Sequence, residues 1–322
     1  MPKLRFAAVA LLFLVAPALA QEYPAKPVVM LVPFAAGGPT DTVARSLAQG
    51  MGKALKQTLV IENAVGAGGT IAPAKLKSAP PDGYTIMLAH IGMSTAPALY
   101  RELPFKPLED FELIGQVVDV PMTLIGKKDL PPDDLRGLLA YIKANKDRIS
   151  FANAGVGSAS HLCGLLFMTQ IQIELTTVPY KGTAPAINDL LGGQVDILCD
   201  QTTNTTQYIK AGRVKAYGTT SSARLDSLRE LPTLAEAGVP GFEVVVWHGV
   251  YAPKGTPKPV VDKLVAALQS AIQEPAFVLR MSDLGSQVVP PEKATPASLR
   301  DRLRGEIDKW TPIIRKAGVY AD

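Results

Sequence analysis

The feature that most constrains the fold of this chain is the alternation of short apolar runs with helical patterns. Buried strands are indicated at Val28–Val32, Leu59–Glu62 and Tyr84–Ala89, each bounded by turn residues. A helical pattern over residues 43–55 separates the first two runs. Strands that alternate with helices predict an α/β fold whose sheet is mostly parallel and covered by helices on both faces.

A second unit of the same kind follows. Strands are predicted at Ile149–Ala152, Thr176–Pro179, Val195–Cys199 and Val214–Thr219, with helices over residues 135–143, 161–170, 184–191 and 205–211. Two long helices are predicted after this unit, at Pro257–Gln273, with Thr256 as N-cap, and at Pro296–Ala317. The chain of 322 residues is long enough for two α/β lobes, each able to bury its own core.

Two extended apolar stretches, Leu113–Gly126 and Phe242–Ala252, bracket the second unit. They predict that the chain crosses between the lobes twice and that the crossing strands form a hinge. On this basis lobe 1 comprises residues 21–120 plus 250–322, and lobe 2 comprises residues 121–249. In such an architecture the ligand cleft lies between the lobes, at the carboxyl ends of their strands.

Residues 1–20 have the plan of a secretory signal peptide. Lys3 and Arg5 precede an apolar run at Phe6–Ala16, and cleavage is expected after Ala20. Because 2 of the 33 basic residues lie in this leader, 31 basic residues balance 29 acidic ones in the mature chain. So small a net charge argues against a nucleic-acid partner. The mature protein is expected to be exported and soluble.

An exported chain enters an oxidising compartment, so a disulfide between Cys163 and Cys199 is the first interpretation of its two cysteines. Closing a loop of this length would contribute roughly 4 kcal/mol of stability. Two buried free thiols remain the alternative. A catalytic thiol is disfavoured, because no sequence typical of a cysteine protease surrounds either residue.

Loops rich in glycine, serine and threonine connect the predicted strands to the helices that follow them. These loops lie at residues 33–41, 66–70, 153–161, 182–185 and 200–205. Each brings main-chain N–H groups and hydroxyls to the positive end of a helix dipole, and glycine lets a ligand approach the backbone closely. Several such loops that converge on one cleft would form a receptor for carboxylate groups.

Other kinds of site fit these loops poorly. None has the Lys-Ser/Thr ending of a P-loop. The glycine patterns that begin at Gly66 and Gly155 have Ile71 and Ser160 where a dinucleotide fingerprint has its third glycine. The 3 histidines are far apart in sequence and have no zinc-site spacing. The sequence therefore predicts no cofactor and no metal.

An exported serine-type hydrolase is the alternative function. Ser158 and Ser160 lie beside His161, which is the composition of a nucleophile and its base. However, neighbours at a helix start seldom point at one another, no Gly-x-Ser-x-Gly motif is present, and N-capping accounts for the serines without chemistry.

Charged side chains are sparse at the loops. Asp41 and Asp200 are interpreted as residues that cap helices, stiffen the loops or hold waters, and one of them could accept an amino group of the ligand. Asp41 can also pair with Arg45 one helical turn further on. Lys181 is the one cation near the glycine-rich loops, and a solvated lysine is its default interpretation.

Essentially the whole mature chain resembles the Bug, or TctC-like, family of periplasmic solute-binding receptors, which serve tripartite tricarboxylate transporters. The resemblance rests on motifs at residues 33–41, 66–69, 157–162, 178–182, 189–196, 231–233 and 252–257. It implies a two-lobe Venus-flytrap fold, the type II periplasmic-binding-protein fold, which captures a ligand by hinge closure. In the family, main-chain groups, hydroxyls and ordered waters hold the ligand carboxylate rather than a fixed arginine.

Carried over position by position, the resemblance implies ligand contacts from both lobes. In lobe 1 these are Phe34, Gly37, Gly38, Thr40, Asp41, Gly69, Ala89, His90 and Ile91. In lobe 2 these are Gly157, Ser158, Ser160, His161, Asp200 and Asn204. The run Cys199–Thr206 is similar to a subgroup that includes an aspartate receptor, and the terephthalate receptors of the family are also similar.

The resemblance leaves three ligand classes open: amino dicarboxylates such as aspartate, simple C4 to C6 dicarboxylates, and aromatic carboxylates such as terephthalate. It implies a periplasmic location and a receptor without enzymatic activity, whose partners are the ligand and the membrane permease subunits of a tripartite tricarboxylate transporter. The receptor is expected to be a monomer.

Overall fold

The computed structural model describes residues 22–321, so the predicted signal peptide and its cleavage after Ala20 lie outside the described residues. The strands are β1 (Val28–Val32), β2 (Leu59–Asn63), β3 (Thr85–His90), β4 (Phe111–Gly126), β5 (Ser150–Asn153), β6 (Thr176–Pro179), β7 (Ile197–Gln201), β8 (Lys215–Thr219), β9 (Val245–Pro253) and β10 (Gln287–Val288). The α-helices are α1 (Pro39–Leu55), α2 (Ile71–Lys77), α3 (Gly92–Leu99), α4 (Leu135–Asn145), α5 (Ala159–Ile171), α6 (Thr183–Leu191), α7 (Thr202–Lys210), α8 (Leu234–Ala237), α9 (Lys258–Ile272), α10 (Pro275–Asp283) and α11 (Pro296–Ala317).

A 10-stranded sheet runs through both lobes in the order β2-β1-β3-β9-β4-β7-β5-β6, and β10 and β8 each pair with β4. β1 pairs in parallel with β2 and β3, and β5 pairs in parallel with β6 and β7. β4 and β9 pair antiparallel with their neighbours. The predicted α/β fold is therefore confirmed, and its parallel pattern is interrupted where the long strands pass through the sheet.

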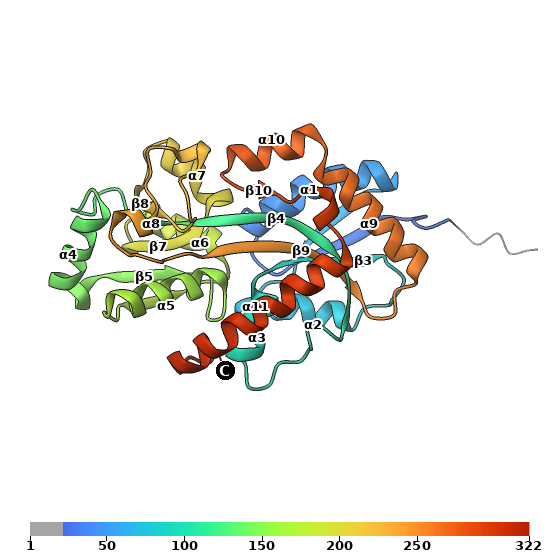
Figure 1. The fold of residues 1–322 in the computed structure, drawn as a ribbon, viewed down its shortest axis with the longest axis horizontal. Coiled ribbons are helices and arrows are strands. Elements are labelled where there is room, and N and C mark those ends of the chain that lie inside the picture. The colour runs from blue at the N-terminus through green and yellow to red at the C-terminus, as the bar shows by residue number, and fades with distance from the viewer. Residues whose placement is uncertain (1–21, 322) are drawn as a thin grey trace, which may run out of the picture.

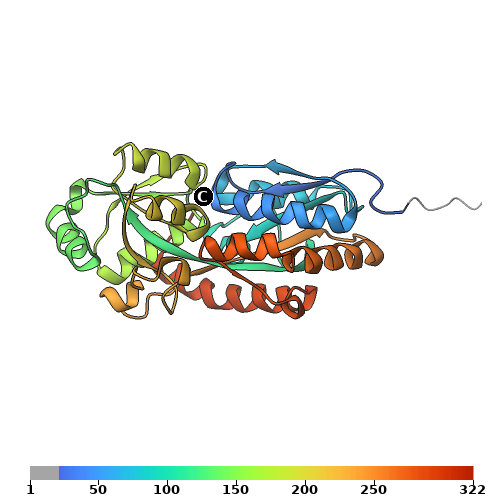
Figure 2. The ribbon, with the colours of Figure 1, turned by 90° about the horizontal axis from the view of Figure 1, so that it is seen from above.

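Two strands cross between the lobes, as the extended stretches predict. β4 pairs with β9 from Phe111 to Pro121 and with β7 from Met122 to Gly126, so it passes from one half of the sheet to the other between Pro121 and Met122. Figure 1 shows β4 and β9 side by side, spanning the distance between the two lobes. Seen from above, the lobes lie next to each other and the C-terminal end lies between them (Figure 2).

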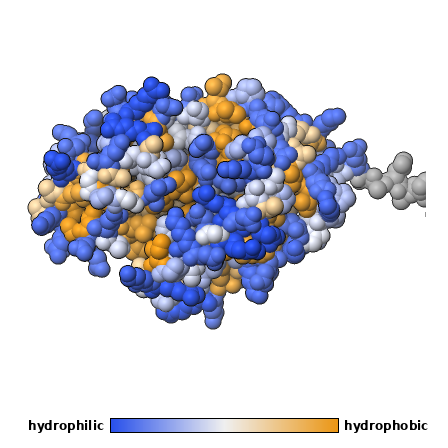
Figure 3. Space-filling model, in the orientation of Figure 1, coloured by the Kyte–Doolittle hydropathy of each residue, from blue (hydrophilic) through white to orange (hydrophobic). Residues whose placement is uncertain are grey.

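The apolar runs of the sequence form the interior. Val28, Met30 and Leu31 of β1 are fully buried, and α1 covers the sheet with the face that contains Leu47 and Met51. The face of the molecule shown in Figure 3 is mostly hydrophilic, with hydrophobic residues in separate patches. Within residues 22–321, no helix combines the length and the apolar character that crossing a membrane requires.

The last helices pack on lobe 1. α9 lies against α1, and α11 lies against α3 and β4. α11 has the bounds that its sequence pattern predicts, but the predicted N-cap of α9 at Thr256 is wrong. Pro257 is the N-cap, because the Thr256 hydroxyl donates to the Pro253 carbonyl (2.8 Å) and closes the preceding turn instead. α10 and β10 were not predicted.

Cys163 and Cys199 form a disulfide, which confirms the first interpretation of the two cysteines over that of free thiols. The bond joins α5 to β7, with the two Cα atoms 6.1 Å apart. Both residues are buried. The disulfide thus fixes the first half of α5 to the strand that carries Asp200.

Candidate functional site

The strand-to-helix loops of the two lobes touch across the cleft. Gly68, in the loop before α2, packs on lobe 2 so tightly that a Cβ built on it would lie 2.0 Å from the Val156 carbonyl oxygen. The Tyr100 hydroxyl, at the end of α3, donates to the Ala67 carbonyl (2.7 Å) and lies 3.3 Å from the Val156 carbonyl. The structure therefore shows the two lobes closed on each other.

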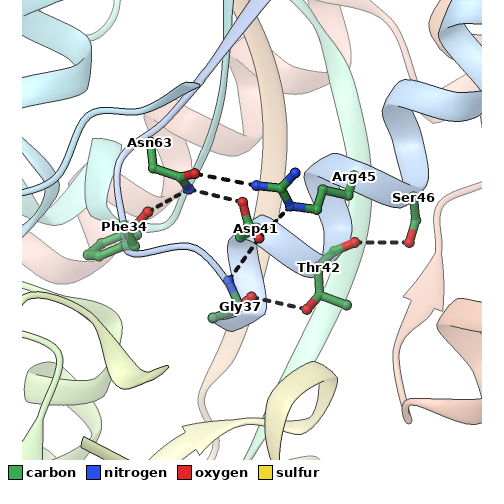
Figure 4. Close-up of polar contacts among 8 residues, drawn as sticks. Phe34, Gly37, Asp41, Thr42, Arg45, Ser46 and Asn63 are labelled. Carbon is green, nitrogen blue, oxygen red and sulfur yellow. Dashed lines mark hydrogen bonds and ion pairs between the residues drawn. The ribbon is translucent and has the colours of Figure 1, made fainter. Parts of the chain in front are cut away.

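Asp41 organises the loop between β1 and α1 (Figure 4). Its buried carboxylate accepts hydrogen bonds from the Gly37 amide (2.9 Å), Arg45 Nε (2.7 Å) and Asn63 Nδ2 (2.9 Å). Asn63 Nδ2 also donates to the Phe34 carbonyl (2.9 Å). Burial acts to raise the pKa of Asp41, but the hydrogen bonds outweigh it and hold this pKa below its usual value. Asp41 is thus an ionised carboxylate whose hydrogen bonds are made to groups of the protein itself.

These contacts settle how the loop uses its own polar groups. The predicted pairing of Asp41 with Arg45 is confirmed, but Asp41 is not the cap, because α1 has Gly38 as its N-cap. The Gly37 amide donates to Asp41, and the Gly38 amide donates to the Ala35 carbonyl (3.2 Å). The N–H groups that can face a ligand are therefore those of the first turn of α1, which have no acceptor within the helix.

Two imidazoles and a phenyl ring stack behind the start of α1. The Phe34 ring stacks on His90 with centroids 4.8 Å apart, and His90 meets His248 edge to face at 5.7 Å. His248, on the crossing strand β9, lies 3.3 Å from the Thr40 hydroxyl through Nε2. Burial lowers the pKa of both histidines, that of His90 to about 4. Both rings are therefore neutral near pH 7 and supply no cation to the cleft.

The serines of the α5 loop are engaged by the backbone. Ser158 is the N-cap of α5 and its hydroxyl accepts from the His161 amide (3.2 Å), as N-capping predicts. The Ser160 hydroxyl donates to the Cys199 carbonyl (2.6 Å). The His161 ring accepts from the Gly157 amide through Nδ1 (3.3 Å). Neither serine hydroxyl is bonded to the His161 imidazole, so the nucleophile and base of a hydrolase are not assembled here.

Asp200 is the next-to-last residue of β7 and is fully buried. Its carboxylate accepts from the Gln201 amide (2.8 Å) and from Asn204 Nδ2 (2.6 Å). Burial raises the pKa of Asp200 to about 7, because these hydrogen bonds offset the loss of hydration only in part. The interpretation of Asp200 as a cap is wrong by one residue, since Gln201 is the N-cap of α7.

Asp200 makes the stability of the fold depend on pH. Its pKa rises from 3.8 to about 7, so the carboxyl stays protonated in the folded state over this range while it ionises in the unfolded chain. The stability that the Asp200 carboxyl contributes is fully present below pH 3.8 and is lost as the pH rises through about 7. Between these two pH values, Asp200 should make the free energy of unfolding of wild type fall by about 1.4 kcal/mol per pH unit. We expect Asp200→Asn to remove this fall.

Urea unfolding of wild type and Asp200→Asn at several pH values between about 4 and 8 measures this difference. Other groups titrate in both proteins and cancel in the comparison. Parallel curves for the two proteins would show that Asp200 is ionised in the folded state throughout.

Two pockets lie where the loops of the lobes meet. A small cavity of about 10 Å³ is shared by both lobes, and a larger pocket of about 270 Å³ opens between the loops at residues 66–69 and 154–156. The small cavity brings together five of the predicted site residues: Phe34, Gly69, Ala89, His90 and Gly157. Among the residues that line the larger pocket, Lys181 is the only one with a cationic side chain.

Two further predicted residues follow the carboxyl ends of strands in different lobes, β3 and β7. Ile91 is buried at the start of α3, and Asn204 is buried in the first turn of α7. Sequence reasoning missed five residues that the structure brings to the loops: Asn63, Tyr100, Val156, Thr183 and Ala184. Thr183 and Ala184 lie in one of the glycine-rich loops that the sequence predicts to face the cleft. Asn63 could have been predicted as a polar residue directly after a predicted strand. Tyr100 carries no local signal.

Two α/β lobes joined by a pair of crossing strands, with glycine-rich loops that meet in the cleft, define a two-lobe periplasmic-binding-protein fold. Among residues 22–321, no group of three or more His, Cys, Asp or Glu side chains is arranged to hold a metal ion.

Comparison with known proteins identifies the family. The sequence model of the tripartite tricarboxylate transporter family receptor matches residues 43–319. A protein of Agrobacterium vitis, named for its place in the TAR-I ttuE-ttuC' intergenic region, is 45% identical over 317 residues, which cover 98% of this chain and 92% of that protein.

Solved structures agree with this match. The structure of the periplasmic binding protein BugD superimposes with a TM-score of 0.91 at 54% identity, covering 92% of this chain and 99% of that one. MatC from Rhodopseudomonas palustris with bound malate superimposes with a TM-score of 0.87 at 40% identity, covering 91% and 100%. The chain belongs to the tripartite tricarboxylate transporter receptor family, which is a family of solute-binding receptors and not of enzymes.

Proposed function

We propose that this protein is an exported periplasmic receptor that captures a small carboxylate between its lobes for uptake by a tripartite tricarboxylate transporter. The ligand is a dicarboxylate, an acidic amino acid or an aromatic carboxylate, and the second partner is the set of permease subunits in the membrane. The receptor acts as a monomer. Lobe 1 comprises residues 21–120 plus 250–322, and lobe 2 comprises residues 121–249.

The observation that carries this proposal is that helix starts of both lobes meet in the cleft, where Lys181 is the only cationic side chain among the residues that line the larger pocket. Arg45 is paired with Asp41, and the imidazoles of His90 and His248 are neutral near pH 7. The loops therefore offer an anion main-chain N–H groups and helix dipoles. That MatC, at 40% identity, has malate bound supports a carboxylate as the ligand class.

Ligand contacts are proposed from the strand-to-helix loops of both lobes. In lobe 1 we propose Phe34, Gly37, Gly38, Thr40, Asp41, Gly69, Ala89, His90 and Ile91. In lobe 2 we propose Gly157, Ser158, Ser160, His161, Asp200 and Asn204. Several of these residues act by holding the loop in its shape, because the Gly37 amide and the Ser160 hydroxyl already have hydrogen-bond partners within the protein.

Ligand capture then follows from closure of the lobes. In the open form a carboxylate meets the helix start of one lobe and water on its other side. Closure expels that water and brings the second lobe's N–H dipoles to the same charge, where the lower dielectric strengthens their interaction. The ligand shifts the protein toward the closed form by as much as it binds that form more tightly.

A thermal unfolding screen of the mature protein tests the proposed function. The panel contains L-aspartate, L-malate, adipate and terephthalate, with dimethyl adipate as the uncharged control. A ligand present at about 1,000 times its Kd adds roughly 4 kcal/mol to the free energy of unfolding, which raises the Tm by several degrees. We expect at least one acid, and not the ester, to do so. A panel without any shift would contradict the proposal.

The hydrolase alternative is tested on the same samples. A receptor returns its ligand chemically unchanged, so mass spectrometry after prolonged incubation should recover each acid and the ester intact. Ester cleavage that Ser158→Ala abolishes would favour the hydrolase.

A further inference from the structure

The sheet has a free edge at β2, away from the cleft. Among the described strands, β2 pairs with β1 alone. The Thr58 carbonyl accepts a hydrogen bond from the start of β1 (3.0 Å), and the Ala64 amide donates to its end (2.8 Å). Because the residues of a parallel strand that bond to one neighbour alternate, the main-chain groups of Leu59 and Ile61 point away from β1. They form an unpaired edge to which a further strand can add.

A groove lies between this edge and one face of α1. It has a volume of about 750 Å³, and Leu59 and Ile61 line it from β2. The helix contributes five residues and its C-cap: Arg45, Ala48, Gln49, Gly52, Lys53 and Lys56. Gly52 has no side chain and Ala48 only a methyl group, which leaves room for an added backbone. We call this site the edge groove, and none of its residues lines the two pockets in the cleft.

The charge of the edge groove is of one sign. Arg45, Lys53 and Lys56 line it, and no acidic residue does. Arg45 pairs with Asp41 (2.7 Å), and Lys53 pairs with Glu274 (2.9 Å), but both acids lie outside the lining. An exposed ion pair is weak, and the Lys53 side chain is 68% exposed, so its ammonium remains able to bind a second acid.

This charge indicates what kind of chain fits the groove. Pairing of β2 with β2 of a second copy would bring two sets of cations together, and their repulsion disfavours it. A segment with acidic side chains complements the groove instead.

We propose that the edge groove binds an acidic segment of a partner protein in an extended conformation, which adds to β2 as a further strand. Main-chain hydrogen bonds to Leu59 and Ile61 hold the segment. Side chains on alternate residues of the segment face α1, where their carboxylates meet Lys53 and Lys56. The inference goes beyond the proposed function, because it concerns a surface outside the cleft and holds whichever acid the cleft binds.

A fluorescently labelled peptide in which glutamate alternates with valine tests the proposal, and fluorescence anisotropy with the mature protein gives the Kd. Lys53→Glu/Lys56→Glu reverses the charge of the groove. Lys143→Glu/Lys146→Glu is the matched control, because these two lysines have the same spacing and occupy the last turn and the C-cap of α4. A second peptide, methylated on all its main-chain nitrogens, has the same charge but cannot donate to a strand edge. Thermal unfolding without peptide reports the fold of each variant.

We expect wild type and Lys143→Glu/Lys146→Glu to bind the unmethylated peptide with Kd values within about twofold of each other. Lys53→Glu/Lys56→Glu should bind it about tenfold more weakly or worse, and wild type should bind the methylated peptide about tenfold more weakly or worse.

Three results would overturn the proposal. Equal affinity of wild type for both peptides would mean attraction between charges without strand addition. An equal loss of affinity in both double variants would mean that the peptide binds elsewhere. Wild type that binds neither peptide, whether it stays a monomer or forms a dimer in sedimentation, would show that the groove does not accept an acidic strand.

Discussion

Gly68→Ala is expected to abolish most ligand affinity without unfolding the protein. The added Cβ would lie 2.0 Å from the carbonyl oxygen of Val156 in the other lobe, and neither atom is at the end of a flexible side chain that could move away. Overpacking of this kind costs about 1–3 kcal/mol, and the rigid contact places it at the upper end. The Cβ would also lie 2.7 Å from the Tyr100 hydroxyl of its own lobe, but that atom ends a flexible side chain that can move away. The cost that remains arises when the lobes close, so we expect the Kd to rise by about a hundredfold.

Gly212→Ala is the matched control for this prediction. Gly68 and Gly212 have nearly the same positive φ, 59° and 62°, but nothing lies within 4 Å of a Cβ built on Gly212. Both substitutions carry a similar left-handed strain of about 1 kcal/mol and should lower the Tm alike. Small-angle scattering should show Gly68→Ala more extended than wild type at a saturating acid concentration. Wild-type affinity in Gly68→Ala would mean that closure does not need this contact.

Loss of the disulfide is expected to have the largest effect on stability. Cys163 and Cys199 are 36 residues apart, and releasing this loop in the unfolded chain corresponds to about 4 kcal/mol. The double variant Cys163→Ala/Cys199→Ala should therefore unfold about 6 °C below wild type. Its Tm should not change with dithiothreitol, whereas reductant should lower the Tm of wild type.

Alkylation of the purified protein provides the chemical control. Unfolded but unreduced wild type should take up no alkylating reagent, and two equivalents after reduction. A wild-type Tm that reductant leaves unchanged would contradict a stabilising role for the bond. Two reactive thiols in the unreduced protein would contradict the bond itself.

Much of the fold could be predicted because its elements carry local signals. The β1 and β6 runs and the amphipathic stripe of α11 have the bounds that their patterns predict. β10 has only two residues and is held by its pairing with β4, so no local pattern marks it. The cap of α9 was misplaced because the Thr256 hydroxyl prefers a nearby turn carbonyl to the helix amides, a choice that depends on the path of the loop.

The candidate site shows the same division between local and distant contacts. The pairing of Asp41 with Arg45 spans one helical turn and is legible in the sequence. The hydrogen bond from Asn63 to Asp41 joins two different strand ends, and the contact of Gly68 with Val156 joins two lobes. Such contacts depend on how the sheet orders its strands and on how far the lobes close, which local spacing does not encode.

The most direct measurement of the central claim is a crystal structure of the protein with the acid of the panel that binds most tightly. The account predicts the acid in the crevice between the lobes, with a carboxylate oxygen within hydrogen-bonding distance of backbone nitrogens at helix starts from both sides. A carboxylate paired instead with the ammonium of Lys181 or with any guanidinium, or an acid bound outside the crevice, would contradict it.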